Sequence, residues 1–177
     1  MDDAVPLSWN EIKDRALRFS REFAADSNEH AEAKTFWDAF FDVFGVSRKR
    51  VATFERKVKK LDGRDGYIDL LWKGVLLIEH KSRGKNLDRA HAQARDYFHG
   101  LSDAELPKYL LVSDFARFRL YDLESGEEPV EFALAEHIAR DRVIAATGPR
   151  PLAAGHRLDC LVVQAHIFTR RSRSALP

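Results

Sequence analysis

The chain has 177 residues, of which 45% are hydrophobic and 32% charged, and its formal net charge is +1. This size suggests one domain with an appendage and a real core, and a neutral total leaves room for a local basic stripe that binds nucleic acid. The single cysteine, Cys160, excludes an intramolecular disulfide framework and a cysteine-based zinc site; with no signal peptide and no apolar run long enough for a membrane, we expect a soluble cytoplasmic protein.

Two amphipathic helices are predicted at the N-terminal end. The first begins after Ser8, an N-cap with Glu11 three residues later, and its apolar residues recur at helical spacing up to Phe23. The second extends over residues 29–44 and ends at Gly45. Its aromatic side, which we assign to the core, consists of Phe36, Trp37, Phe40, Phe41 and Phe44.

Three strands are predicted next. Residues 46–60 carry seven basic side chains and one acidic side chain, and the spacing of Val51, Phe54 and Val58 indicates a strand. After a turn at residues 62–66, the apolar runs 67–72 and 75–81 are separated by Lys73-Gly74 and predict a hairpin.

The rest of the domain is predicted to contain one helix and two strands. Residues 86–99 have helical periodicity, residues 109–112 are typical of a buried strand, and residues 117–123 alternate as a half-exposed strand. The element order α-α-β-β-β-α-β-β predicts a mixed α/β domain with a central sheet flanked by helices. Because Lys and Glu are absent after residue 136, we expect a domain over 1–136 and a divergent tail over 137–177 that is disordered or out of frame.

Two carboxylates and a lysine in the hairpin are the strongest candidates for chemistry. A hairpin brings Asp69 and Glu79 onto strands about 5 Å apart, where both can bind one hard cation. Mg²⁺ prefers oxygen ligands, so the backbone carbonyl of His80 is a suitable third protein ligand. Lys81 lies two residues beyond Glu79 and therefore shares its face of the strand.

A division of labour follows from these residue types. The metal would polarise a phosphodiester and lower the pKa of a bound water. Lys81, kept protonated by two carboxylates, would orient that water or stabilise the developing charge. The alternative is a surface hairpin with ordinary charges. Spacing alone supports both about equally, although charges in apolar strands need a compensating reason.

The pattern resembles the PD-(D/E)xK nuclease superfamily, with Asp69, nine residues, and then Glu79-His80-Lys81. Ile68 replaces the proline of the motif, and the element order matches the core of the superfamily. Gln93 and Tyr97, four residues apart on one helical face, resemble the Q-x-x-x-Y motif of RecB-like members. The resemblance implies Mg²⁺ as cofactor, with Mn²⁺ able to substitute, and a role for Gln93 and Tyr97 in contacting DNA or bracing the site.

Residues 8–123 more specifically resemble the N-terminal nuclease domain of MmeI-like Type IIL restriction-modification enzymes. The segments that carry the resemblance are SWNEIKDRALRF, NEHAEAKTFWDAFFDVFG, DGYIDLLWKGVLLIEHKSRG, DRAHAQARDYFHGL and LVSDFARFRLYDLE. The resemblance implies a DNA endonuclease domain with double-stranded DNA as substrate. In the family this domain is fused to a methyltransferase and a target-recognition domain. This chain has no NPPY motif and no glycine-rich cofactor loop, so we expect a product truncated before the methyltransferase that binds no S-adenosylmethionine.

Three alternatives stay open beside this function. The chain could be a non-catalytic DNA-binding remnant, a subunit active only with a separate methyltransferase or specificity protein, or a structural protein with accidental acids.

Further site residues are predicted around the hairpin. Glu32 is a candidate for a third metal-binding carboxylate, although first-turn acids are also favoured by the helix dipole. The ring of His80 should face the other side of its strand, packed or in solvent. Lysines and arginines supply sequence-independent affinity for the DNA backbone. For Arg83 and Lys85, a solvated loop is the alternative. The predicted DNA contacts are Lys57, Lys59, Lys60, Arg83 and Lys85.

Overall fold

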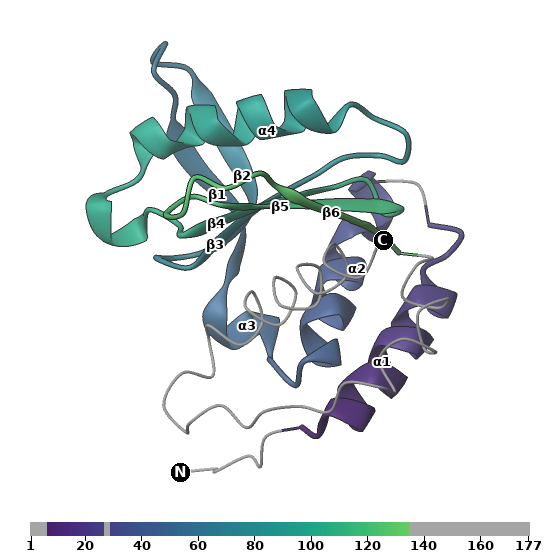
Figure 1. Ribbon diagram of the computed structural model, residues 1–177. Helices are drawn as coiled ribbons and strands as arrows, with labels where there is room; N and C mark the ends of the chain where they lie inside the picture. Colours follow the sequence, from purple (N-terminus) through teal and green to yellow (C-terminus); the bar gives the residue numbers. More distant parts are fainter. Residues whose placement is uncertain (1–6, 27–28, 135–177) are drawn as a thin grey trace.

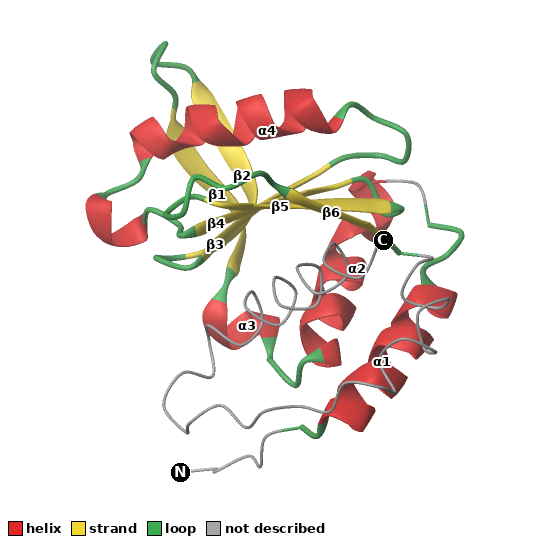
Figure 2. Cartoon of the chain, in the orientation of Figure 1, coloured by secondary structure: helices red, strands yellow, loops and turns green. Residues whose placement is uncertain are grey.

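The computed structural model describes residues 7–26 and 29–134. Figure 2 shows its helices and strands. The predicted tail over 137–177 lies outside the described residues. None of the described helices has the length and apolarity needed to span a membrane. The elements are α1 (Trp9–Glu22), α2 (Glu29–Val43), α3 (Arg48–Val51), β1 (Thr53–Lys59), β2 (Asp65–Trp72), β3 (Leu76–His80), α4 (Leu87–Asp96), the 3-10 helices η1 (Tyr97–Gly100) and η2 (Asp103–Glu105), β4 (Tyr109–Ser113), β5 (Arg117–Asp122) and β6 (Val130–Ala133).

The strands form one mixed sheet in the order β1-β2-β3-β4-β5-β6. Neighbouring strands are antiparallel except β3 and β4, which are parallel. A parallel pair needs a crossover connection, and α4 supplies it. In Figure 1, α4 covers one face of the sheet, while α1 and α2 lie on the other. The predicted α/β class with a central mixed sheet is therefore confirmed.

Local sequence signals set the helix boundaries. The Ser8 Oγ accepts a hydrogen bond from the Glu11 backbone N–H at 3.2 Å. The Asn86 side chain accepts from the backbone N–H groups of Asp88 and Arg89, which caps α4 in the same way. Gly45 follows α2 with a φ of +71°, the left-handed conformation that glycine adopts without steric cost. These boundaries agree with the predicted ones.

Three features differ from the predicted elements. Val51 lies in the short helix α3, so the strand begins only at Thr53. The predicted helix over 86–99 changes to 3-10 geometry at Tyr97, where the chain approaches β1 so closely that a Cβ on Gly100 would lie 2.5 Å from the Lys59 carbonyl oxygen. Strand β6 pairs with β5 and was not predicted.

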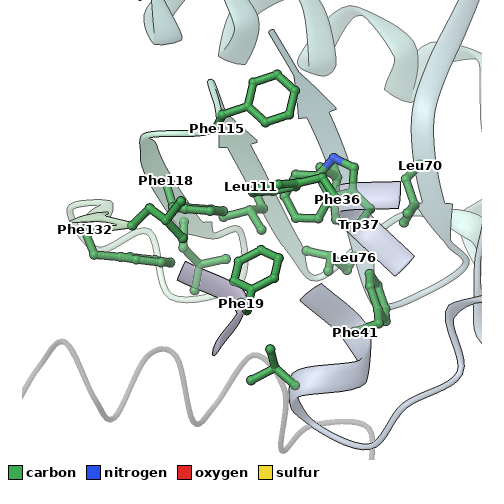
Figure 3. Close-up of a cluster of buried hydrophobic side chains, with 14 of the residues drawn as sticks. Phe19, Phe36, Trp37, Phe41, Leu70, Leu76, Leu111, Phe115, Phe118 and Phe132 are labelled. Carbon is green, nitrogen blue, oxygen red and sulfur yellow. The ribbon is translucent and has the colours of Figure 1, made fainter. Parts of the chain in front are cut away.

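The hydrophobic core is divided by the sheet into two layers. The aromatic layer lies between the sheet and helices α1 and α2, as Figure 3 shows, and includes Phe19, Phe36, Trp37, Phe41, Leu70, Ile78, Phe115 and Phe118. The α4 layer lies on the opposite face and contains Val58, Ile68, Leu71, Leu77, Leu87, Ala90, Ala94, Tyr97, Leu110 and Val112. The assignment of the aromatic stripe of α2 to the core is confirmed.

Candidate active site

The β2–β3 hairpin brings Asp69 next to Glu79. The last regular pairs in this ladder are Trp72 with Leu76, Leu71 with Leu77 and Leu70 with Ile78. One further step of the same register places Asp69 opposite Glu79. At that point the ladder ends, and the Asp69 Oδ2 accepts the backbone N–H of His80 at 2.6 Å. The carboxylate is therefore fixed at the position where the two strands separate.

Strand β2 changes faces at Asp69. Ile68 packs in the α4 layer and Leu70 in the aromatic layer, although residues two apart in a regular strand share a face. The partner strand β1 changes faces at the same height, because Phe54 packs against the aromatic layer and Val58 in the α4 layer. Glu55 lies at this point with a φ of +54°, which is uncommon for a residue other than glycine. Asp69 thus lies on a bend shared by both strands.

Glu79 and Lys81 form an ion pair on β3 and the residues that follow it. The Lys81 Nζ lies 2.6 Å from the Glu79 Oε1, and the Glu79 side chain is fully buried. The backbone N–H of Lys81 donates to the Ser113 carbonyl at 2.8 Å, so β4 holds the main chain at this residue. The Lys81 side chain as a whole is 21% exposed, so this end of the ion pair is not fully enclosed.

The ring of His80 points away from this ion pair. It packs in the aromatic layer, with its centroid 4.2 Å from that of Phe115 and 5.4 Å from that of Trp37. Burial lowers the pKa of His80 to about 3, so the ring is neutral at ordinary pH. Of the two positions left open by the sequence, packed or in solvent, the ring takes the packed one. Only the backbone carbonyl of His80 is left as a candidate ligand.

Gln93 and Tyr97 lie beside the carboxylates. The Gln93 Nε2 donates to the Tyr97 hydroxyl at 2.6 Å. Burial, followed by the negative charge of Glu79, raises the pKa of Tyr97 to about 12, and the charge of Asp69 acts in the same direction. The Tyr97 hydroxyl therefore stays protonated at neutral pH. The structure brings together Asp69, Glu79, Lys81, Gln93 and Tyr97.

The loop after Lys81 is clamped from two sides. Arg83 donates through Nε and Nη2 to the carbonyls of Asp26 and Ala24 at the end of α1. Asp114, which is fully buried, accepts from the Gly84 backbone N–H at 3.0 Å and from the guanidinium of Arg117. The Arg117 Nη2 in turn donates to the Lys85 carbonyl at 3.0 Å, which fixes the last residue of the loop.

Asp114 is the residue of this region that sequence reasoning missed. The sequence places it directly after the buried strand β4. Its carboxylate oxygens accept backbone N–H groups from two separate segments, one at Gly84 and one at Arg117. An aspartate that ends an apolar strand before a turn is the signal that could have indicated it.

The predicted DNA-contacting lysines have different surroundings. Lys57 and Lys59 are exposed and share one carboxylate, that of Asp65, at 2.8 Å and 2.5 Å. The ammonium of Lys60 lies over the ring of Tyr97, 5.2 Å from its centroid. Lys85 is exposed on the loop that Asp114 clamps.

Glu32 lies with other acids near the ends of α1 and α2. Burial and then the negative charge of Glu32 raise the pKa of Asp26, whereas Arg83 lowers it. Within residues 7–26 and 29–134, no group of three or more His, Cys, Asp or Glu side chains is arranged to hold a metal ion. The oxygens that the hairpin itself offers are those of Asp69, Glu79 and the His80 carbonyl, and a third carboxylate from Glu32 stays a prediction.

The mixed sheet with helices on both faces defines a restriction-endonuclease-like α/β fold. The family described as "MmeI, N-terminal domain" matches residues 14–159. This is more than half of the chain, so the chain belongs to the MmeI N-terminal domain family. The family resemblance found in the sequence is confirmed. The match continues past residue 136, and the predicted domain boundary there stays a prediction.

Among solved structures, the chain is similar to one in a structure entitled "cryoEM structure DrdV-DNA complex". The TM-score is 0.49 and the sequence identity 13%, over 85% of this chain. This chain spans 13% of the length of the chain it matches. No curated protein matches it.

Proposed function

We propose that this chain is the Mg²⁺-dependent DNA endonuclease domain of a restriction-modification enzyme and hydrolyses phosphodiester bonds of double-stranded DNA. The observation that carries the proposal is the end of the β2–β3 ladder, where Asp69 is fixed by the His80 N–H and Glu79 pairs with Lys81 at 2.6 Å. Membership in the MmeI N-terminal domain family supports it. Mn²⁺ is expected to substitute for Mg²⁺.

The residues present fit a small divalent cation. Asp69 and Glu79 offer carboxylate oxygens, and the His80 peptide between the ladder and Lys81 offers a carbonyl, which together form the hard oxygen set that Mg²⁺ prefers. The His80 ring is excluded because it packs in the aromatic layer. Mg²⁺ bound there would lower the pKa of a bound water and polarise the scissile phosphodiester.

Lys81 is the residue that we expect to act directly on the reacting groups. Its ammonium is held beside Glu79 while part of the side chain stays open to solvent. From this position it can orient the attacking water and stabilise charge on the phosphate oxygens. The hydrogen bond from its backbone N–H to Ser113 limits its movement, so the charge is positioned before substrate arrives.

Gln93 and Tyr97 brace the site in this proposal. Tyr97 accepts its hydrogen bond from Gln93, which leaves the hydroxyl proton of Tyr97 to donate to a substrate phosphate. The raised pKa of Tyr97 keeps that proton in place at neutral pH. Gln93 lies in the last turn of α4 and Tyr97 begins η1 directly after it, so they link the position of that helix to the strands of the site.

Contacts with DNA and with other domains complete the proposal. Lys57, Lys59, Lys60, Arg83 and Lys85 are proposed to contact phosphates, where basic side chains add affinity without sequence preference. Because the family is defined as an N-terminal domain, a methyltransferase and a target-recognition domain are expected to direct the nuclease, either in the same protein or as separate partners. An activity that depends on such a partner is the second candidate function.

A plasmid-nicking assay tests the activity. We expect the wild-type chain to nick supercoiled DNA with Mg²⁺ or Mn²⁺ and not with EDTA. Lys81→Ala and Asp69→Ala should lower nicking by about 10³-fold or more because each removes a charge at the reacting groups. Lys73→Ala, in the turn at the other end of the same hairpin, is the matched control and should nick like wild type.

Two outcomes would contradict the proposal. One is nicking by Lys81→Ala at the wild-type rate. The other is no nicking by the wild-type chain in Mn²⁺, even at high concentration and with a co-purified methyltransferase partner added.

A further inference from the structure

The β1–β2 hairpin ends in an ordered tip that projects beyond α4 (Figure 1). Lys57 pairs with Tyr67 and Lys59 with Asp65 in its ladder. At the tip, the Lys60 N–H donates to the Arg64 carbonyl at 2.9 Å. The left-handed Gly63 and the bond from the Arg64 N–H to the Asp62 carboxylate complete the turn. We call residues 56–67 the arm.

The inner face of the arm is held against the end of α4. Val58 is buried in the α4 layer, next to the site residue Tyr97. A Cβ on Gly66 would lie 2.7 Å from the Tyr97 ring, and a Cβ on Gly100 would touch the main chain of Lys59. Because this face is closely packed, the arm is preorganised and only its outer face is left to meet a partner.

The outer face combines exposed apolar groups with positive charge. Leu61 is 74% exposed and Tyr67 is 54% exposed, and they are two of the three large hydrophobic residues that are exposed in the described part of the chain. Lys57 and Lys59 lie beside Tyr67 and share the single carboxylate of Asp65. The arm has five basic and two acidic residues, a net charge of +3, whereas the whole chain has +1.

The width of a two-stranded ribbon is compatible with duplex DNA as the anionic partner. Two strands about 4.8 Å apart, with their side chains, form a ribbon roughly 10 Å wide. The major groove of duplex DNA is about 12 Å wide and admits such a ribbon, whereas the minor groove is about 6 Å wide. Tyr67 precedes Asp69 by two residues, roughly 7 Å along the strand, so the arm continues directly into the strand that carries a proposed metal ligand.

We infer that the arm docks in the major groove of duplex DNA, with Lys57 and Lys59 on the phosphates and with Tyr67 and Leu61 against the groove edges of the bases. The inference rests on the proposed function for the choice of DNA as the partner. It adds an interaction surface that includes two apolar residues for which the catalytic site has no use.

The experiment measures binding of the whole chain to a labelled 30-base-pair duplex by fluorescence anisotropy, in EDTA so that no cleavage occurs. We expect Tyr67→Ala with Leu61→Ala to weaken binding about tenfold at every salt concentration. Lys57→Gln with Lys59→Gln should weaken binding and also reduce the slope of log Kd against log salt by about 1.8, since each phosphate contact contributes about 0.9.

Matched controls come from residues outside the arm. Lys73 is 57% exposed and paired with Glu105, as Lys57 is 58% exposed and paired with Asp65. Lys73→Gln with Lys108→Gln should leave the salt slope unchanged. Leu106→Ala, which changes the third exposed apolar residue, should bind like wild type.

Groove choice is tested with modified duplexes. Glucosylated hydroxymethylcytosine fills the major groove and should remove the difference between wild type and Tyr67→Ala, whereas the minor-groove ligand netropsin should leave that difference intact. The inference is overturned by arm variants that bind like wild type, by a reversed response to the two groove blocks, or by an equal loss on single-stranded DNA.

The nicking assay separates this inference from the proposed function. Arm variants that bind and nick like wild type reject the arm but leave the nuclease. Arm-dependent binding by a wild-type chain that never nicks rejects the nuclease but leaves the arm.

Discussion

The two faces of the sheet carry different kinds of side chain. The aromatic layer packs phenylalanine rings from α1, α2 and β5 around Trp37, and His80 is its one buried titratable ring among the described residues. The α4 layer is built from small and aliphatic residues together with Tyr97, whose hydroxyl accepts from Gln93 and senses the charge of Glu79. We therefore expect substitutions in the aromatic layer to affect mainly stability, and substitutions on the α4 face to affect mainly the proposed chemistry.

The largest expected effect is loss of stability in the aromatic layer. Phe36 is fully buried, and its ring centroid lies within 5.3 Å of those of Phe19, Phe23, Trp37 and Phe115. Phe36→Ala should lower the free energy of unfolding by about 3–5 kcal/mol, because it creates a cavity in a packed core. Urea unfolding measures this change.

The control for Phe36 lies on the other face. Phe98 is only partly buried and packs at the border of the α4 layer. Phe98→Ala should lower the free energy of unfolding clearly less than Phe36→Ala does. An equal or larger decrease would contradict the assignment of the main core to the aromatic layer.

The next effect concerns His80 and is a dependence of stability on pH. The pKa of His80 is about 3 in the folded chain and 6.5 in the unfolded chain, so the unfolded chain binds the extra proton first as pH falls. Stability should therefore fall between pH 6.5 and 3, by roughly 2–3 kcal/mol from pH 7 to pH 4.5. His80→Leu should remove most of this loss.

His99 provides the matched control because it is exposed at the end of η1. His99→Leu should keep the wild-type loss between pH 7 and pH 4.5. If His80→Leu also keeps it, another group is responsible for the acid sensitivity of the aromatic layer.

On the α4 face, removing one hydroxyl should affect activity more than stability. Tyr97→Phe breaks the hydrogen bond from Gln93, and the free energy of unfolding should change by no more than about 1.5 kcal/mol. We expect nicking to fall about tenfold, because the brace next to the carboxylates is lost. Tyr121→Phe, which removes a hydroxyl that accepts from Arg119 on the same side of the sheet, is the control and should nick like wild type.

Alkaline pH adds an independent test of Tyr97. Its folded-state pKa of about 12 lies above the ordinary value of 10, so the associated stability is present below pH 10 and is lost as the pH rises from 10 to 12. In metal-free buffer, Tyr97→Phe should lack this part of the loss. An alkaline profile identical to that of wild type would mean that Tyr97 does not titrate as the structure indicates.

Much of the site could be predicted from the sequence because its parts are local. Asp69, Glu79 and Lys81 are candidates from the spacing of one hairpin, and Gln93 and Tyr97 are candidates because one helical turn resembles a family motif. The structure brings these five residues together, although their chemical roles stay predictions. The class of fold was predictable for the same reason, since capping residues and apolar periods set most of the elements.

The parts that could not be predicted depend on contacts between distant segments. Asp114 joins the loop after Lys81 to the β4–β5 turn, 30 residues away in the sequence, and no local pattern indicates that pairing. Glu32 also depends on such contacts. Its negative charge acts on Asp26, just beyond the end of α1, and its assignment as a third metal-binding carboxylate stays a prediction.

The bend at Glu55 is the clearest case, and it provides the smallest predicted effect. An alternating strand pattern gives no sign that both strands change faces there, yet the left-handed φ of +54° at Glu55 costs a residue with a side chain about 1–2 kcal/mol. Glu55→Gly should relieve that cost. It also removes a surface ion pair with Lys34, worth at most about 1 kcal/mol. The variant should therefore be within about 1 kcal/mol of wild type or more stable.

Lys57→Gly is the matched comparison for Glu55→Gly. Lys57 lies two residues further along β1, is similarly exposed and also forms an ion pair with a single partner, but its φ is not positive. Glycine there should lower the free energy of unfolding by about 1 kcal/mol, because it only adds conformational freedom to the unfolded backbone. Urea unfolding of the two variants ranks them. If Glu55→Gly is the less stable variant, the Glu55 side chain, and not its backbone conformation, maintains the bend at which both strands change faces.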